Sequence, residues 1–263
     1  MANYQFIEIT FNGPVATLWL NRPEVRNAFH EGMILEIIQG FEELAAMKLR
    51  MVILRGRGQT FCAGADLNWL KEVVHYSFEQ NIRESQTLAN CFKTIYDCPH
   101  PTLALVHGAA FGGGIGLLAS CDMAFAEPIT LFSFSEVKMG IIPACISPYV
   151  IKRIGEFKAR ELMITGKRFM AKEAERYQLI NQSLKSEELS AKVNEILKCI
   201  LTSAPAAVEQ VKSLINNVCN HWNWEETSGN TAKLIAAIRS TPEAQEGMDA
   251  YLNKRPPSWI SNQ

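Results

Sequence analysis

Strand patterns alternate with helical patterns along the first 130 residues, and this alternation restricts the possible folds more than any other feature. Apolar residues spaced three and four apart predict helices at Glu31–Met47 and Glu79–Tyr96. Runs rich in β-branched and aromatic residues predict strands at Tyr4–Thr10, Val15–Leu20, Met51–Leu54 and Thr102–Val106. Because strands joined by helices usually pair in parallel, the sequence predicts an α/β fold.

The region after Pro148 is almost wholly helical in its pattern. Helices are predicted at Ser186–Leu201, Ala204–Asn217, Trp224–Arg239 and Glu243–Asn253. We therefore predict a core of residues 1–200 followed by a helical region of residues 201–263. The apolar faces of these helices have two explanations at this level: they pack on another subunit, or they pack on the chain's own core.

The charge balance excludes two classes of protein. The chain has a net charge of −1 and is 48 % hydrophobic, whereas nucleic-acid-binding domains carry a basic face and disordered chains lack apolar residues. Its seven cysteines show neither a Cys-x-x-Cys pair nor zinc-type histidine spacing, so we expect reduced thiols and no metal site. The N-terminus lacks the basic and apolar segments of a signal peptide, which predicts a cytoplasmic protein.

The segment Thr102–Cys121 has no acidic or permanently basic side chain and is long enough to cross a membrane. It contains His107 and five glycines, three of them consecutive at Gly112–Gly114. This composition favours a strand, a tight turn and a short helix, so no membrane span is expected.

The glycines at the start of that short helix indicate a binding site. The free N–H groups of a helix start, together with the helix dipole, favour negative charge there. A dinucleotide-binding loop is the alternative, because Gly114 to Ala119 fits G-x-G-x-x-A and Glu136 follows Gly114 by 22 positions. Two features are unusual for that alternative: at least three strands precede the loop, and the acid lies in a Phe-rich run.

Three further segments bear residues that are suited to chemistry. Pro23 restricts the loop Asn21–Phe29, and the small residues of Phe61–Leu67 let a ligand approach the backbone. In Phe132–Pro143 the apolar neighbours of Glu136 would raise its pKa and suit it to carry a proton near neutral pH. Each segment also has a structural explanation: a turn, a loop that opens a helix, and a glutamate paired with a cation such as Lys138 or Arg153.

Taken in order, NRPEVRNAF, FCAGADL, HGAAFGGG, SEVKMGIIP and EGMDAYLNKRPP resemble the motifs of the crotonase (enoyl-CoA hydratase/isomerase) superfamily over nearly the whole chain. The resemblance implies a spiral of ββα units and a C-terminal helical region that builds a homotrimer or a hexamer of two trimers. It implies an acyl-CoA thioester substrate, with coenzyme A as part of the substrate and no other cofactor.

The resemblance also implies residue roles. The backbone N–H groups of Ala65 and Gly113 would form an oxyanion hole for the thioester oxygen. Glu136 matches the second of the two catalytic glutamates of the hydratases. The further positions implied to contact the CoA ester are Val25, Arg26, Ala63, Gly64, Asp66, Leu67, Gly116, Tyr251 and Lys254.

The sequence departs from the hydratase pattern at Gly116, where the first catalytic glutamate would stand. The motifs around it resemble one branch, the bacterial methylglutaconyl-CoA and isohexenylglutaconyl-CoA hydratases, whose branched substrates carry a distal carboxylate. A glycine at this position would enlarge the pocket and remove a repelling charge. The resemblance therefore predicts hydration of 3-methylglutaconyl-CoA to 3-hydroxy-3-methylglutaryl-CoA in leucine degradation. Candidate cations for the distal carboxylate are Arg83, Lys138, Lys152 and Arg153.

Two alternatives remain open from the sequence. An enoyl-CoA isomerase, or another acyl-CoA enzyme of this scaffold, would also suit a single glutamate. A non-catalytic acyl-CoA sensor or RNA-binding protein would bind without turnover, although the even charge gives RNA binding little support.

Overall fold

The computed structural model describes residues 3–261, and the chain divides into two compact units. The first unit consists of residues 1–98 and 102–190, and the second of residues 99–101 and 191–263. The division falls inside a helix, α7 (Ser186–Leu201), whereas the sequence predicted a boundary at residues 200–201. The buried residue of α7 is Leu189, which lies in the part of this helix that belongs to the first unit.

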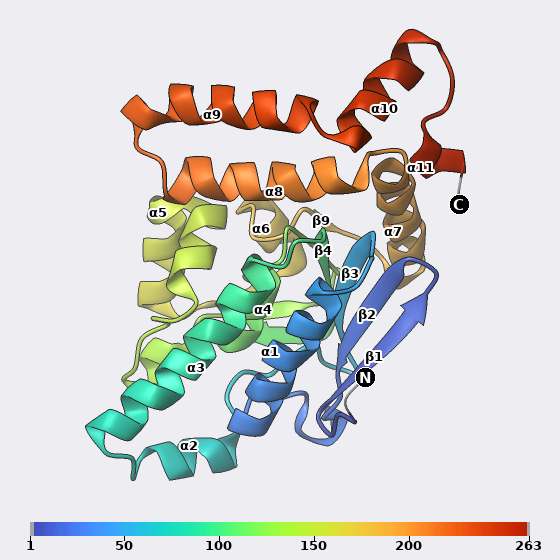
Figure 1. The fold of residues 1–263 in the computed structure, drawn as a ribbon. Coiled ribbons are helices and arrows are strands. Elements are labelled where there is room, and N and C mark those ends of the chain that lie inside the picture. The colour runs from blue at the N-terminus through green and yellow to red at the C-terminus, as the bar shows by residue number, and fades with distance from the viewer. Residues whose placement is uncertain (1–2, 262–263) are drawn as a thin grey trace. The chain divides into compact units, whose positions relative to one another are not determined.

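A six-stranded sheet forms the centre of the first unit (Figure 1). Its order is β1-β2-β3-β4-β6-β9, and all neighbours pair in parallel except the antiparallel pair β1 and β2. The strands are β1 (Ile7–Asn12), β2 (Val15–Leu20), β3 (Met51–Gly56), β4 (Thr102–Val106), β6 (Met123–Ala126) and β9 (Gln182–Ser183). Buried on both faces, β4 is a continuous apolar run after its first residue, as expected of a central parallel strand.

A second, three-stranded sheet has the order β5-β7-β8. Its strands are β5 (Ala109–Phe111), β7 (Leu131–Ser133) and β8 (Arg168–Met170). The helices of the first unit are η1 (Pro23–Val25), α1 (Glu31–Ala45), α2 (Leu67–Val73), α3 (Phe78–Tyr96), α4 (Gly113–Ser120), η2 (Ser135–Met139), α5 (Ser147–Thr165) and α6 (Ala171–Arg176).

The apolar stripe of α1 explains why this helix covers the sheet. Met33, Ile37 and Phe41 are essentially inaccessible to solvent, and burying such a side chain contributes about 1.5–3 kcal/mol. Local sequence also sets where the helices start. The His30 ring accepts a hydrogen bond from the Met33 N–H at the start of α1, and Ser77 forms a reciprocal capping box with Gln80 at the start of α3.

The second unit contains α8 (Pro205–Asn220), α9 (Trp224–Arg239), α10 (Pro242–Leu252) and α11 (Ser258–Ser261). Helices α8 and α9 lie side by side (Figure 1), and an apolar groove between them is lined by Leu214, Ile235 and Ile238. The Glu243 carboxylate accepts hydrogen bonds from the N–H groups of Ala206 and Ala207, so it ties the start of α10 to the start of α8.

The predicted α/β fold is confirmed, and the predicted strand β4 has the observed bounds. The segment Thr102–Cys121 folds as β4, β5 and α4, in agreement with the strand, turn and helix predicted for it. The prediction of an almost wholly helical chain after Pro148 was wrong at β8 and β9, because strands of two and three residues are too short to show a period. No helix among the described residues is long and apolar enough to cross a membrane.

Candidate active site

Backbone pairing brings three of the sequence motifs together. Phe29 donates its N–H to Gly64 O at 2.7 Å, and Asp66 donates its N–H to Phe29 O at 2.7 Å. In the same way Cys62 N–H bonds Ala109 O at 3.1 Å, and Phe111 N–H bonds Cys62 O at 3.1 Å. The loop 61–67 is thus held between the loop that precedes α1 and the segment that leads into α4.

This arrangement leaves the two predicted donors free. Among the described residues no acceptor is present for the N–H of Ala65, and Gly113 is the first residue of α4, where an N–H has no partner inside the helix. Gly64 and Gly112 precede these donors with φ angles of 94° and 49°, which side-chain-bearing residues rarely adopt. The prediction that Ala65 and Gly113 offer free backbone N–H groups therefore agrees with the local geometry, and their catalytic role stays a proposal.

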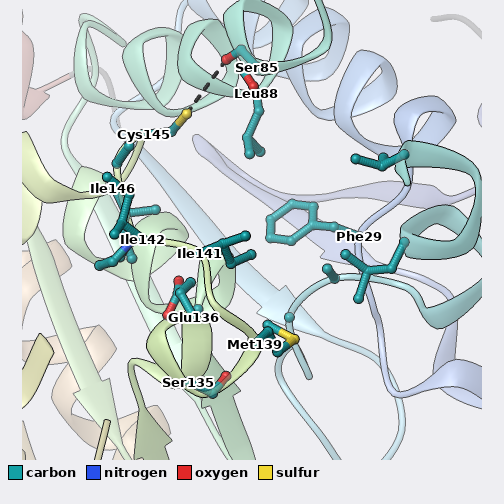
Figure 2. A pocket seen from close by; sticks show the side chains of 18 of the residues that line it. Phe29, Ser85, Leu88, Ser135, Glu136, Met139, Ile141, Ile142, Cys145 and Ile146 are labelled. Carbon is teal, nitrogen blue, oxygen red and sulfur yellow. Dashed lines mark hydrogen bonds between the residues drawn. The ribbon is translucent and has the colours of Figure 1, made fainter. Parts of the chain in front are cut away.

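A cavity of about 620 Å³ adjoins these donors and is lined by Ala65 and Gly113. Apolar side chains from α2, α3 and the segment 139–146 form most of its wall. Figure 2 shows Leu88 of α3 reaching into it from the side opposite Glu136, with the Phe29 ring beside the space between them. Space of this size and polarity suits an acyl chain.

Glu136 lies beside the donors, in the first turn of η2. Its Oε1 atom is 2.9 Å from the position that a Cβ on Gly112 would occupy, and its Oε2 atom is buried with no hydrogen-bond partner among the described residues. Burial raises the pKa of this carboxyl, opposed only by a hydrogen bond from its own backbone N–H. The alternative of a glutamate paired with Lys138 or Arg153 was wrong, because no such pair forms in the described chain.

The raised pKa of Glu136 predicts the acid side of the pH profile. A carboxylate that acts as base works only when ionised, so kcat/KM should fall on acidification at a pH above the usual titration of glutamate, about 4.3. Measuring kcat/KM from pH 4.5 to 8.5 tests this. A profile that stays flat down to pH 4.5 would contradict it.

Gly116 does not fulfil its predicted role. A Cβ on Gly116 would lie 2.3 Å from Cγ2 of Ile146 and 2.7 Å from Cε1 of Phe92. Its place is filled by these two buried side chains, so the glycine does not enlarge the cavity, and it is not among the residues that line it. The dinucleotide-loop alternative does not fit the fold, because that loop follows the first strand of its sheet, whereas Gly114 and Gly116 lie inside α4, after β1, β2, β3 and β4.

The predicted CoA-contacting loops lie together. Ala63 donates its N–H to Arg26 O at 3.0 Å, which joins the loop 21–29 to the loop 61–67. Arg26 has a left-handed backbone, and the side chains of Val25 and Leu67 are exposed. The contact of these loops with a nucleotide stays a prediction.

Asp66, by contrast, is buried and engaged with the protein itself. Its Oδ1 accepts the Asn68 N–H at the start of α2, and its Oδ2 accepts a hydrogen bond from Arg22 at 2.9 Å. These bonds hold the pKa of Asp66 below its usual value against the opposing effect of burial. The prediction that Asp66 contacts the CoA ester is therefore wrong for its side chain, which caps α2.

A substitution series separates these roles of Asp66. We expect Asp66→Ala to lower the free energy of unfolding by about 1–2 kcal/mol through loss of the cap, and Asp66→Asn to lower it less because asparagine also caps helices. Urea denaturation measures both. Equal losses in the two variants would show that the ion pair with Arg22, and not the cap, is the stabilising contact.

The predicted cations for a distal carboxylate do not line the cavity. None of the described residues that line it is Lys, Arg or His. Arg153 is buried and donates to the backbone oxygens of Ala119, Leu179 and Cys121, so it was a wrong candidate. Arg83, Lys138 and Lys152 also lie outside the lining.

Tyr251 and Lys254 belong to the second unit. Tyr251 is an exposed residue of α10, and Lys254 follows the helix in a left-handed conformation. Both are accessible, and their contact with a nucleotide stays a prediction. No group of three or more His, Cys, Asp and Glu side chains that could hold a metal ion occurs among the described residues.

Sequence reasoning missed the wall of the cavity that α3 provides. Asn81, Glu84, Ser85 and Leu88 line it from one face of that helix. Their spacing of three and four was visible in the sequence, but polar residues at this spacing usually form a solvated face. The segment 139–146, whose Cys145 donates its S–H to Ser85 O of α3 at 3.6 Å (Figure 2), gave no periodic signal.

Comparisons with known proteins identify the family and the fold. The sequence matches the model of the Enoyl-CoA hydratase/isomerase family over residues 10–262. The chain belongs to the enoyl-CoA hydratase/isomerase family, the crotonase superfamily. An enoyl-CoA hydratase structure from Shewanella pealeana superimposes with a TM-score of 0.93 at 38 % identity, covering 97 % of this chain and 96 % of the other.

Further relatives of this family match over similar lengths. The enoyl-CoA isomerase/hydratase fer4 of Mycosarcoma maydis is 31 % identical over 253 residues, covering 91 % of this chain and 90 % of its own. The structure of Pseudomonas aeruginosa AtuE has a TM-score of 0.92 at 29 % identity and covers 97 % of this chain and all of its own, 100 %. The resemblance seen in the five motifs is confirmed, and the crotonase fold is shared across the whole chain.

Proposed function

We propose that this protein hydrates a 2,3-unsaturated acyl-CoA. The observation that carries the proposal is the half-buried Glu136, whose buried Oε2 atom has no hydrogen-bond partner among the described residues and which lines the same cavity as Gly113 and Ala65. A buried carboxylate oxygen without a partner is costly to keep, and the chemistry of an acyl-CoA enzyme gives it a use.

The reaction follows from these groups. The thioester oxygen accepts hydrogen bonds from Ala65 and Gly113 N–H, which stabilise it most when it becomes negative. Glu136 takes a proton from water while the water oxygen bonds to C3 and the π electrons move toward the thioester oxygen. The enolate then takes the proton from Glu136 at C2. One water adds across the double bond, and the carboxylate is regenerated.

The substrate proposed from the sequence is 3-methylglutaconyl-CoA, with a role in leucine degradation. The motif resemblance supports it, whereas the lack of a Lys, Arg or His among the described lining residues does not supply the expected partner for its distal carboxylate. Comparing kcat/KM for 3-methylglutaconyl-CoA and crotonyl-CoA, with product identified by mass, tests the proposal. Failure to hydrate either substrate would contradict the hydratase function.

An enoyl-CoA isomerase is the second candidate. It is favoured by the single carboxylate beside the two donors, because moving one proton between C2 and C4 requires one base and no water. A 3-enoyl-CoA incubated with the protein distinguishes the two: a 2-enoyl product with the same mass as the substrate would identify the isomerase.

The remaining expectations are part of the same proposal. Coenzyme A enters as part of the substrate without a further cofactor, and the chain acts in the cytoplasm as a homotrimer or a hexamer. The exposed apolar side chains of α8 and α9, such as Val211 and Ile235, support association through helices. Size-exclusion chromatography with light scattering measures the assembly, and a monomer at micromolar concentration would contradict it.

A further inference from the structure

The cavity has two polar ends. Glu136 and the free N–H groups form one, and Asn81, Glu84 and Ser85 on α3 form the other. Glu84 and Glu136 are the charged side chains among the described lining residues. Figure 2 shows Ser85, the neighbour of Glu84 on α3, on the side of the cavity away from Glu136.

Glu84 is half-buried, and no cation pairs with it among residues 3–261. Its Oε2 accepts a hydrogen bond from the Ser85 hydroxyl at 3.2 Å. Some other carboxylates of the first unit have cationic partners, such as Glu161 with Lys167. A carboxyl left without one on a cavity wall has no stabilising role in the fold that we can identify.

The other hydrogen-bond donors on this face of α3 are already used. Asn81 Nδ2 donates to the backbone oxygens of Tyr76 and Ser77 at 3.2 and 3.1 Å, and Ser85 donates to Glu84. A protonated carboxyl carries one O–H donor. Glu84 in its protonated form is therefore the side chain on this wall that can donate to a bound molecule.

We propose that Glu84, flanked by Asn81 and Ser85, is a recognition site for an oxygen-bearing group at the far end of the acyl chain. The ligand class is an acyl-CoA whose chain ends in a carboxylate or a hydroxyl. This inference rests on the proposed acyl-CoA function and explains how a cavity without a lining cation can accept such a chain.

The surroundings of Glu84 favour its protonated form. Burial raises the pKa of Glu84 most, the Glu31 carboxylate at the start of α1 raises it further, and the Ser85 hydroxyl lowers it. Cys145 and Tyr76 are the other titratable groups near it, and the negative charge of Glu84 raises the pKa of both, after burial as the larger cause. A protonated Glu84 donates to a carboxylate, whereas an ionised one repels it.

Binding of saturated acyl-CoA esters tests the inference without requiring turnover. Pentanoyl-CoA, 5-hydroxypentanoyl-CoA and glutaryl-CoA share a five-carbon chain that ends in a methyl, a hydroxyl or a carboxylate. We expect Glu84→Leu to raise Kd for the hydroxyl and carboxylate chains about tenfold more than for the methyl chain, measured by titration calorimetry. Glu84→Gln should restore most of this discrimination, because its amide also donates.

The pH dependence of Kd tests whether the protonated form of Glu84 binds the carboxylate chain. In the wild type Kd for glutaryl-CoA should rise as pH rises through the titration of Glu84, and in Glu84→Gln it should stay level. The matched control is Glu79→Gln, at an exposed carboxyl on the same helix. It should leave the Kd for each of the three esters unchanged.

Equal loss of affinity for all three esters in Glu84→Leu, or no loss for any, would overturn the inference. These outcomes are separate from the proposed hydratase function, which is tested by water addition to 2-pentenoyl-CoA. A wild type that binds the three esters with discrimination but adds no water would overturn the hydratase function alone.

Discussion

Replacing Glu136 with glutamine is expected to lower kcat for 2-enoyl-CoA hydration by about 10³-fold, within the range that one acid–base group contributes. Glutamine keeps the shape of the side chain but can neither take a proton from water nor return one to C2. The affinity for a saturated acyl-CoA should change little, because the donors of Ala65 and Gly113 are backbone groups. Rapid mixing with 2-enoyl-CoA and calorimetry with the saturated ester measure the two effects.

Glu156→Gln supplies the control, since this carboxylate lies on the exposed side of α5, 72 % accessible, and pairs only with Arg160. It should leave kcat unchanged. Near-native turnover of Glu136→Gln would show that another group activates water.

Glu136→Gln is also expected to be at least as stable as the wild type at pH 7.5. A carboxyl whose folded pKa is raised binds its proton more tightly in the folded state, so wild-type stability falls as pH rises from the unfolded pKa to the raised one. Glutamine removes this loss. The difference in melting temperature between variant and wild type should therefore shrink as the pH falls below the unfolded pKa of about 4.3, where Glu136 is mostly protonated in both states. A variant markedly less stable at pH 7.5 would indicate a structural role for the charge.

The order of motifs in the sequence was sufficient to predict the fold and the polar end of the cavity. The glycine triplet, the small residues before Asp66 and the glutamate among phenylalanines can each be recognised in the local sequence. The structure brings Gly113, Ala65 and Glu136 together at one cavity. The distal end could not be predicted. Glu84 looks like a solvated helix residue until the segment 139–146 closes over α3, and contacts between segments so far apart in the chain leave no local pattern.

Gly116 shows the same limit in the opposite direction. The family resemblance identified Gly116 as the position of a missing glutamate, but the prediction that it enlarges the pocket assumed an empty space. Ile146 and Phe92 fill that space. A motif can predict where a residue stands in the fold. It cannot predict which side chains pack against that residue, because they come from elsewhere in the sequence.

Restoring a glutamate at position 116 is therefore expected to unfold the first unit and not to create a second catalytic acid. The Cβ alone would stand 2.3 Å from Ile146 Cγ2 and 2.7 Å from Phe92 Cε1. Such overpacking costs about 1–3 kcal/mol for alanine. Glutamate adds an unpaired buried charge, for which the penalty is several kcal/mol, on the order of the whole stability of a domain. Urea denaturation followed by circular dichroism measures the alanine variant, and solubility measures the glutamate variant.

Two further variants, Gly229→Ala and Ile146→Ala, test whether the expected loss comes from the clash beside Gly116. Gly229 lies inside α9 with no atom within 4 Å of its Cβ position, so Gly229→Ala should stabilise the protein by about 0.5–1 kcal/mol through helix entropy alone. Ile146→Ala removes the nearest clashing methyl group, so Gly116→Ala should cost less in that background than in the wild type. If Gly116→Ala proved as harmless as Gly229→Ala, the space beside Gly116 would be open to the cavity, and the enlarged pocket expected from the sequence would be correct after all.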